Sequence, residues 1–316
     1  MSIQQMMLGQ VPPAGGGGAV LTGWYGNRGI RGGGWSPNMN SIGYVDITST
    51  GNASNFGTMT QSARGRGAAS NGSRGIWLGG RSMSPGPDAN CEYITFANTG
   101  SGTNFGEMNF PGGYSSGTSD GTKAFAMGNA GYANNIDYFT FTSTGNGTDF
   151  GDMVYGRYAQ DSGSYGNRAV IAGNRDVNNY QHMDYFTMGT TSGNASDFGE
   201  MTGRADCCLV NSAVGRAVIC GGGPGSDQVS NVMEYVDMSV LSNSTDFGDL
   251  DQTRGQLGSG GCANATRGLI WGGCTSGGGG AITNNIQYIE IASTSNSTDF
   301  GNMAGSTSFV GAMSGS

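Results

Sequence analysis

The side chains that could ligate a metal or act as a nucleophile are few in this sequence. His182 is the only histidine, and we expect it in a surface loop just before a strand. The six cysteines include no CxxC pair, so the ligand spacing typical of a zinc site is missing. Six thiols in 316 residues are also too sparse for a disulfide framework. We therefore expect free, mostly buried thiols and a reducing compartment.

Carboxylates recur in three pairs that could bind calcium, because hard cations prefer clustered oxygen ligands. The pairs are Asp149 with Asp152, Asp197 with Glu200, and Asp246 with Asp249. An earlier copy of the same motif has Asn55 and Thr58 at these positions, so the carboxylates are not kept throughout the chain. Calcium binding stays open, and the sequence predicts no catalytic, cofactor-binding or metal-ligating residue and no cofactor.

The carboxylate pairs recur with a triplet, Asn/Asp-Phe-Gly, that occurs six times. Protein kinases use Asp-Phe-Gly to hold magnesium, but the kinase catalytic loop and strand lysine are missing here. We expect a structural role, in which the phenylalanine anchors a core, the glycine permits a tight backbone and the polar residue bonds turn amides. The six phenylalanines are Phe56, Phe105, Phe150, Phe198, Phe247 and Phe300.

A tyrosine precedes each phenylalanine by twelve residues, or by thirteen in the fourth copy. The six tyrosines are Tyr44, Tyr93, Tyr138, Tyr185, Tyr235 and Tyr288. Upstream of each tyrosine lies a basic residue, a short apolar run and a glycine five residues after the base. The six glycines are Gly33, Gly79, Gly128, Gly173, Gly221 and Gly272. The chain therefore contains six copies of one structural unit.

Each unit has the sequence signals of short antiparallel strands. Asn71 and Gly72, a typical hairpin pair, separate two short runs, and alternation from Tyr93 to Phe96 places successive side chains on opposite faces. Four short strands in about 48 residues match the blade of a β-propeller. The sequence thus predicts an all-β fold, a six-bladed propeller with four-stranded blades.

The innermost strand of the first blade could come from either end of the chain. Residues 307–313 form a strand-like run after the last unit, and residues 19–22 are the rival. We favour the C-terminal strand, because joining the two chain ends in one blade leaves no open sheet edge in the ring. The predicted domains are an N-terminal anchor or linker segment, 1–26, and the propeller, 27–316.

The recurring base has two possible roles in such a ring. The bases are Arg28, Arg74, Lys123, Arg168, Arg216 and Arg267. They could surround the central channel with positive charge, or each could donate hydrogen bonds to carbonyls or a carboxylate of the next blade. We favour the second role.

Composition excludes several classes of function. The chain carries a net charge of −8, only 11% of its residues are charged, and 62 are glycine. Nucleic-acid binding needs a clustered basic face, and none occurs, so we expect no nucleic-acid partner. The first residues lack a signal-peptide pattern and no run of about 18 apolar residues occurs, so we expect no membrane insertion.

The repeats resemble a known family. Segments 74–80 and 267–273 each end in Gly-Gly ahead of a tyrosine, as kelch repeats do. Kelch repeats usually carry a tryptophan shortly after the tyrosine, and this chain has the Asp-Phe-Gly element instead, as in 148–151 and 298–301. This variant is similar to the kelch-like propellers of tailed-phage virion proteins, particularly those of marine phages. Residues 2–8 also resemble the opening of many phage structural proteins.

The resemblance implies a non-enzymatic virion structural protein, a tail protein or a capsid decoration, present in several copies with other virion proteins as partners. It would be made in the host cytoplasm without a signal peptide and located in the virion. A contribution to host attachment, with a surface glycan as partner, stays open. The alternative is a soluble or cell-surface carbohydrate-binding propeller, a lectin or adhesin. Galactose oxidase, a kelch enzyme, needs several copper-binding histidines, and one histidine cannot supply them.

Binding is expected at loops that vary while the strands do not. These loops follow the glycine of each unit and include 81–90, 223–230 and 275–282. The Asn-x-Ser/Thr sequences at Asn52, Asn146, Asn194, Asn243 and Asn296 are expected to form turns between strands rather than glycosylation sites. Residues 1–26, Met-rich and then Gly-rich, are interpreted as an adhesive segment and linker, with a disordered tail as the alternative.

Overall fold

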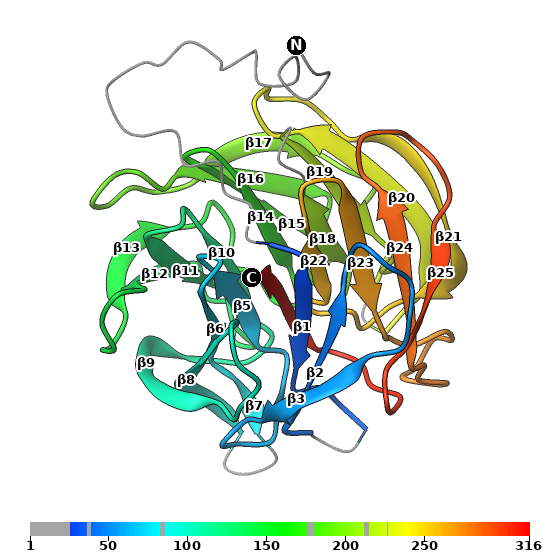
Figure 1. The fold of residues 1–316 in the computed structure, drawn as a ribbon. Coiled ribbons are helices and arrows are strands. Elements are labelled where there is room, and N and C mark those ends of the chain that lie inside the picture. The colour runs from blue at the N-terminus through cyan, green and yellow to red at the C-terminus, as the bar shows by residue number, and fades with distance from the viewer. Residues whose placement is uncertain (1–25, 37–38, 83–85, 176–179, 212–214, 226) are drawn as a thin grey trace, which may run out of the picture.

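The computed structural model describes residues 26–36, 39–82, 86–175, 180–211, 215–225 and 227–316. Within these residues all regular structure is β, in six antiparallel sheets arranged around a centre (Figure 1). The protein is a six-bladed β-propeller, as the repeats predict. The predicted N-terminal segment lies outside the described residues, apart from Gly26.

The first three blades each run from the central channel outward. Blade 1 consists of β26 (Gly311–Gly315), β1 (Arg28–Gly32), β2 (Ser41–Asp46) and β3 (Ser54–Thr58). Blade 2 consists of β5 (Gly67–Ser70), β6 (Arg74–Leu78), β8 (Pro87–Thr95) and β9 (Thr103–Gly112), and is extended by β4 (Ala63–Arg64) and β7 (Gly80–Ser82). Blade 3 consists of β10 (Ser116–Ser119), β11 (Lys123–Met127), β12 (Asn135–Thr140) and β13 (Thr148–Asp152).

The other three blades repeat the same order. Blade 4 consists of β14 (Asp161–Tyr165), β15 (Arg168–Ala172), β16 (His182–Thr187) and β17 (Ser196–Glu200). Blade 5 consists of β18 (Cys208–Asn211), β19 (Arg216–Cys220), β20 (Ser230–Asp237) and β21 (Thr245–Arg254). Blade 6 consists of β22 (Gly261–Ala263), β23 (Arg267–Trp271), β24 (Asn285–Glu290) and β25 (Thr298–Asn302).

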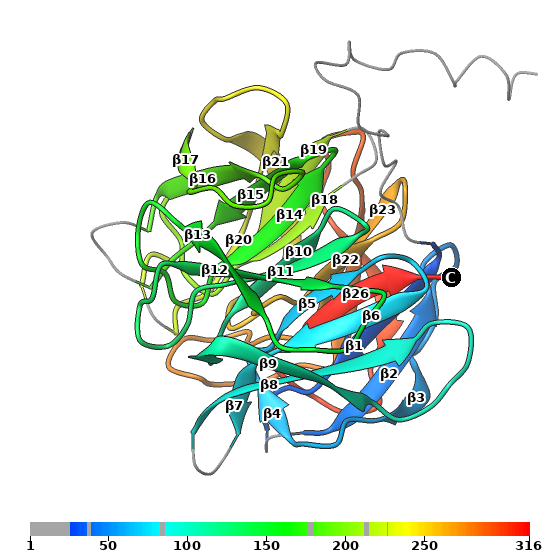
Figure 2. The same cartoon turned by 90° about the vertical axis from the view of Figure 1, so that its left-hand side faces the viewer.

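The C-terminal strand closes the ring, which confirms the prediction. β26 pairs antiparallel with β1 over its whole length, from Gly311 opposite Gly32 to Gly315 opposite Arg28. Figure 2 shows β26 lying against β1 and close to β5 and β6 of the next blade. The two ends of the propeller thus share one sheet, so the inner edge of blade 1 is paired.

The apolar core is divided among the blade interfaces. The repeated phenylalanines are all at most 2% exposed, and each ring edge meets its own blade's repeated tyrosine at 5.8–6.3 Å between centroids. Aliphatic and sulfur side chains from the facing blade complete each cluster, for example Ile289 and Ile291 of blade 6 against Phe247 of blade 5. All six cysteines are free and buried in these clusters or beside them.

The repeated base joins each blade to the next through a hydrogen bond to a backbone carbonyl, which is the role that we favour from the sequence. Its charged group lies over the tyrosine of its own blade, 4.3–5.2 Å from the ring centroid. The same group donates to a backbone carbonyl of the following blade. The accepting residues, in chain order of the base, are Phe96, Phe141, Thr190, Met238, Ile291 and Ile47. Because the last acceptor lies in blade 1, the series is closed.

The sequence-predicted turns also join neighbouring blades. Each of the five asparagines accepts a hydrogen bond from the backbone N–H two residues after the phenylalanine of the preceding blade, at 2.9–3.1 Å. The glycine of the triplet lies directly under this turn. At Gly106 a Cβ would stand 2.1 Å from the carbonyl oxygen of Gly145, and its φ is +151°. Glycine is required there because backbone from the next blade occupies the side-chain position.

Replacing Gly106 with alanine tests this close approach. The clash with Gly145 and the unfavourable φ should lower the free energy of unfolding by about 1–3 kcal/mol in urea denaturation. Gly145→Ala is the matched control, because a Cβ at Gly145 meets nothing within 4 Å and the change should be near neutral. Equal stability of the two variants would contradict this packing between blades.

Candidate functional site

One end of the central channel is closed by a ring of six residues with left-handed backbone conformation. Each lies just before the innermost strand of a blade, and φ is between 53° and 60° at all six. The members of this ring, which we call the plug, are Gly65, Tyr114, Ala159, Asp206, Gln256 and Phe309. Five of the six are not glycine, although left-handed conformation costs other residues about 1 kcal/mol or more.

Backbone hydrogen bonds run all the way around the plug. The N–H of each of five members donates to the carbonyl of the member before it, at 2.7–3.3 Å, with Gly65 closing the circle through the carbonyl of Phe309. At the remaining step Leu257, next to Gln256, donates to Asp206 at 3.1 Å. The tight backbone turn is therefore enforced by neighbours on both sides, which explains how non-glycine residues are held there.

Backbone strain is concentrated at this end of the propeller. Among the described residues, the non-glycine positions with positive φ outside the plug are Ser36, Tyr132 and Asp227. All three lie in loops between the second and third strands of a blade, which open at the same end as the plug. Strain of this kind persists where function or surrounding structure requires it. This end, with the variable loops around it, is the candidate functional site.

Aromatic and cationic side chains gather over the plug. The ring of Tyr114 contacts Tyr158 at 4.9 Å and Phe309 at 4.8 Å, both edge to face. Tyr158 in turn contacts Tyr132, whose side chain is 46% exposed. Arg64 lies over Trp35, outside this chain of rings, at 3.9 Å from the ring centroid. We call Trp35, Arg64, Tyr114, Tyr132, Tyr158 and Arg175 the aromatic–arginine cluster.

Arg175 links the cluster to two acidic loops. Its guanidinium pairs with Asp206 at 2.7 Å and Asp227 at 2.9 Å, and it lies over Tyr158 at 5.0 Å. Burial raises the pKa of Asp206, and hydrogen bonding to Arg175 opposes that rise. Burial also raises the pKa of Tyr158 to about 12, so this hydroxyl is neutral at physiological pH. The positive charge of Arg175 is thus neutralised by carboxylates of the protein itself.

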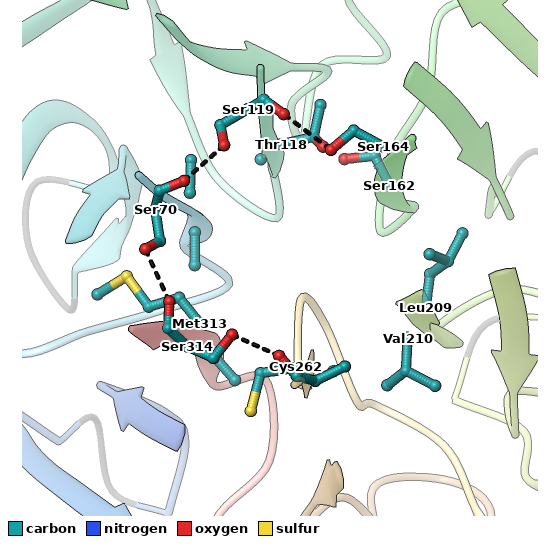
Figure 3. A pocket seen from close by; sticks show the side chains of 16 residues that line it. Ser70, Thr118, Ser119, Ser162, Ser164, Leu209, Val210, Cys262, Met313 and Ser314 are labelled. Carbon is teal, nitrogen blue, oxygen red and sulfur yellow. Dashed lines mark hydrogen bonds between the residues drawn. The ribbon is translucent and has the colours of Figure 1, made fainter. Parts of the chain in front are cut away.

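The other end of the channel is lined by hydroxyl groups. Ser70, Ser119, Ser164 and Ser314 occupy equivalent positions at the ends of inner strands, and each donates to a carbonyl of the adjacent blade at 2.5–2.8 Å. Figure 3 shows these side chains following one another around the opening. They line a cavity of about 70 Å³, room for about two water molecules.

A buried carboxyl lies in the channel wall between the two ends. Asp161, at the start of β14, accepts hydrogen bonds from the backbone N–H groups of Ser162 and Leu209, both at 2.8 Å. Burial nevertheless raises its pKa to about 7. Its charge is therefore disfavoured by the fold even though its oxygens have donors.

Stability should fall as pH rises through the range that Asp161 titrates. Between about pH 4 and pH 7 the unfolded chain loses this proton while the folded protein keeps it, so folding is penalised by up to roughly 4 kcal/mol above pH 7. In Asp161→Asn the penalty is absent. Urea denaturation of both proteins from pH 4 to pH 8 should show the variant gaining stability relative to wild type. A constant difference across this range would contradict the assignment.

Most residues singled out in the sequence lie away from the plug. The repeated tyrosines, phenylalanines and bases serve the blade interfaces, and the repeated glycines end the second strands. His182 is the first residue of β16 rather than a loop residue, and it stacks on Tyr155 at 5.0 Å. This placement corrects the expected position, because the backbone of β16 already pairs with β17 at His182, opposite Glu200. The three carboxylate pairs lie on the outermost strands β13, β17 and β21. Within the described residues no three His, Cys, Asp or Glu side chains are grouped to hold a metal ion.

Sequence reasoning missed a second set of inter-blade contacts. The residue before the repeated tyrosine is a buried acid or amide in five blades: Glu92, Asp137, Asp184, Glu234 and Gln287. Each accepts from a backbone N–H of the preceding blade, four residues after its phenylalanine, at 2.6–3.2 Å. Buried arginines pair with three of these acids, as Arg204 does with Glu234 at 2.6 Å. The signal in the sequence is the acid or amide that precedes five of the six repeated tyrosines.

Replacing Arg204 tests how much these buried ion pairs contribute to the free energy of unfolding. Arg204→Met leaves Glu234 charged and largely buried, so the free energy of unfolding should fall by about 3–5 kcal/mol. Adding Glu234→Gln should recover part of that loss, because the uncompensated charge is then gone. Thermal or urea unfolding of both variants measures this. A double variant no more stable than Arg204→Met would contradict the charge-burial explanation.

Comparisons with known proteins give no identity. The chain matches no protein-family model and no curated protein. In the part of the chain that the structure describes, no helix is long and apolar enough to cross a membrane.

Proposed function

We propose that this chain is a non-enzymatic structural component of a phage virion, a tail or capsid appendage of the kelch-like type, with its loop end available for attachment to a surface. The repeat variant, which has Asp-Phe-Gly in place of the kelch tryptophan, supports a protein of the kelch-like virion type. The propeller supplies the scaffold, and the variable loops around the plug supply the contact surface.

The observation that supports this proposal most strongly is that the repeated side chains make structural contacts. Bases, tyrosines, phenylalanines, turn asparagines and buried acids all contact the same or the adjacent blade, in every blade or in five of six. Repetition therefore builds a closed, rigid disc. The non-repeated residues gather at one end, as expected of a display scaffold rather than of a catalytic pocket shared by repeats.

A second candidate function is a carbohydrate-binding propeller, soluble or on a cell surface. The aromatic–arginine cluster favours it, because partly exposed aromatic rings beside charged groups are typical of binding surfaces. The two candidate functions place the protein in different locations, in a virion or free of one, but both use the loop end of the propeller for binding.

Fractionation of particles from the source culture tests the first candidate. Purified particles are banded on a density gradient, and this chain is quantified by peptide mass in every fraction. We expect co-banding with the capsid protein at a fixed ratio. Absence from the particle band, with the chain recovered in the soluble fractions, would overturn the virion assignment and favour the free lectin.

A further inference from the structure

We propose that the aromatic–arginine cluster is a binding site for an acidic saccharide, and that Arg64 holds the carboxylate of a uronic or sialic acid residue. This inference rests on the proposed attachment function and names the ligand class of its binding end. The cluster lies at the centre of the loop end, beside the plug.

Arg64 is the cation available for a ligand. Its guanidinium lies over Trp35 at 3.9 Å and faces Tyr114 at 5.7 Å, so ring contacts fix its position. Its buried Nε has no hydrogen-bond partner, and no carboxylate of the described residues forms an ion pair with it. A planar guanidinium held in this way matches a carboxylate through two parallel hydrogen bonds.

Positive charge is gathered around Arg64 in a chain that is acidic overall. Arg81 stands opposite Arg64 across the β4–β7 pair, so a second basic residue lies in register with it. Arg175 approaches the same Tyr114 ring at 5.8 Å, but Asp206 and Asp227 neutralise it. Of the two cluster arginines, Arg64 is the one without a carboxylate partner among the described residues.

The aromatic rings supply faces for the sugar itself. Trp35 and Tyr158 are partly exposed and Tyr132 is 46% exposed, so their apolar surfaces border the guanidinium. Tyr132 is also held at a φ of 57°, an unfavourable conformation for a bulky residue. Its ring is thereby fixed beside Tyr158, and a rigid aromatic face costs little entropy on binding.

An acidic saccharide fits these observations better than a polyanion or a peptide. A long polyanion such as nucleic acid would be repelled by the net charge of −8. The cluster offers one unpaired cation between ring faces, which corresponds to one carboxylate on one ring-shaped residue. An acidic peptide is the competing ligand and is included in the test.

Isothermal titration calorimetry with the purified full chain tests the site. The probes are tetragalacturonate and sialyllactose, with the neutral counterparts tetragalactose and lactose, and hexaglutamate as the peptide. We expect binding of at least one acidic saccharide and at least tenfold weaker binding of its neutral counterpart. Binding of tetragalacturonate alone identifies a uronate, and binding of sialyllactose alone identifies a sialate. Absence of binding to both, or equal binding of hexaglutamate, overturns the proposal.

Variants locate the binding to Arg64. Arg64→Gln should weaken binding about tenfold to a hundredfold, the value of a charge-assisted hydrogen-bond pair. Arg64→Lys should recover only part of it, because an ammonium group lacks the planar fork. Thr142→Asp, an exposed turn substitution that changes the net charge equally, should bind as wild type does. An equal loss in Thr142→Asp would overturn the site. Unchanged thermal unfolding of Arg64→Gln shows that the fold is kept, and Tyr132→Ala, which leaves the charge intact, should also weaken binding.

The two proposals fail in different ways. A chain that bands with particles but binds neither acidic saccharide keeps its virion role and loses this site. A chain that is absent from particles but binds through Arg64 loses the virion role and keeps this site.

Discussion

Each blade interface depends on one charged group that makes two contacts at once. The repeated base lies on the tyrosine of its own blade and donates to a carbonyl of the next, so it fixes both the spacing and the relative rotation of the two sheets. The carbonyl it reaches lies just after the third strand of the next blade, where the ladder has ended and the oxygen needs a partner. With the contact present at every interface, including the one from blade 6 to blade 1, an error in one blade angle is opposed by all the others.

The sequence predicted the repeated strand pattern and the closing strand, and it missed the buried acids before the tyrosines, the plug and the aromatic–arginine cluster. The recurring tyrosine-to-phenylalanine spacing predicted the number of blades, and the strand-like run after Phe300 predicted how the ring closes. Both predictions depend on local strand patterns. The plug escaped prediction because its members, among them Tyr114, Asp206 and Phe309, share a backbone conformation and no side-chain property. The aromatic–arginine cluster escaped for a related reason. Trp35, Arg64 and Arg175 lie far apart in the sequence and in different blades, so no local pattern indicates that they share one cluster.

The two ends of the channel have different physical character. At the plug, the backbone adopts an unfavourable conformation that its neighbours enforce, and the side chains are aromatic or charged. At the opposite end, serine hydroxyls satisfy carbonyls of adjacent blades and leave a small polar cavity. Between the two ends Asp161 is buried, and this burial raises its pKa. The two ends therefore differ in chemistry, even though every blade repeats the same strand order.

Closure by β26 also sets the order in which the protein can be completed during synthesis. The inner strand of the first blade, β26, follows every other strand of the propeller in the chain, so the strands of blades 2 to 6 are synthesised before the ring can close. Until then the apolar face of blade 1 that receives Met313 stays open to solvent and to other nascent chains. Pairing of β26 with β1 is therefore the step that turns an open arc of blades into a closed propeller.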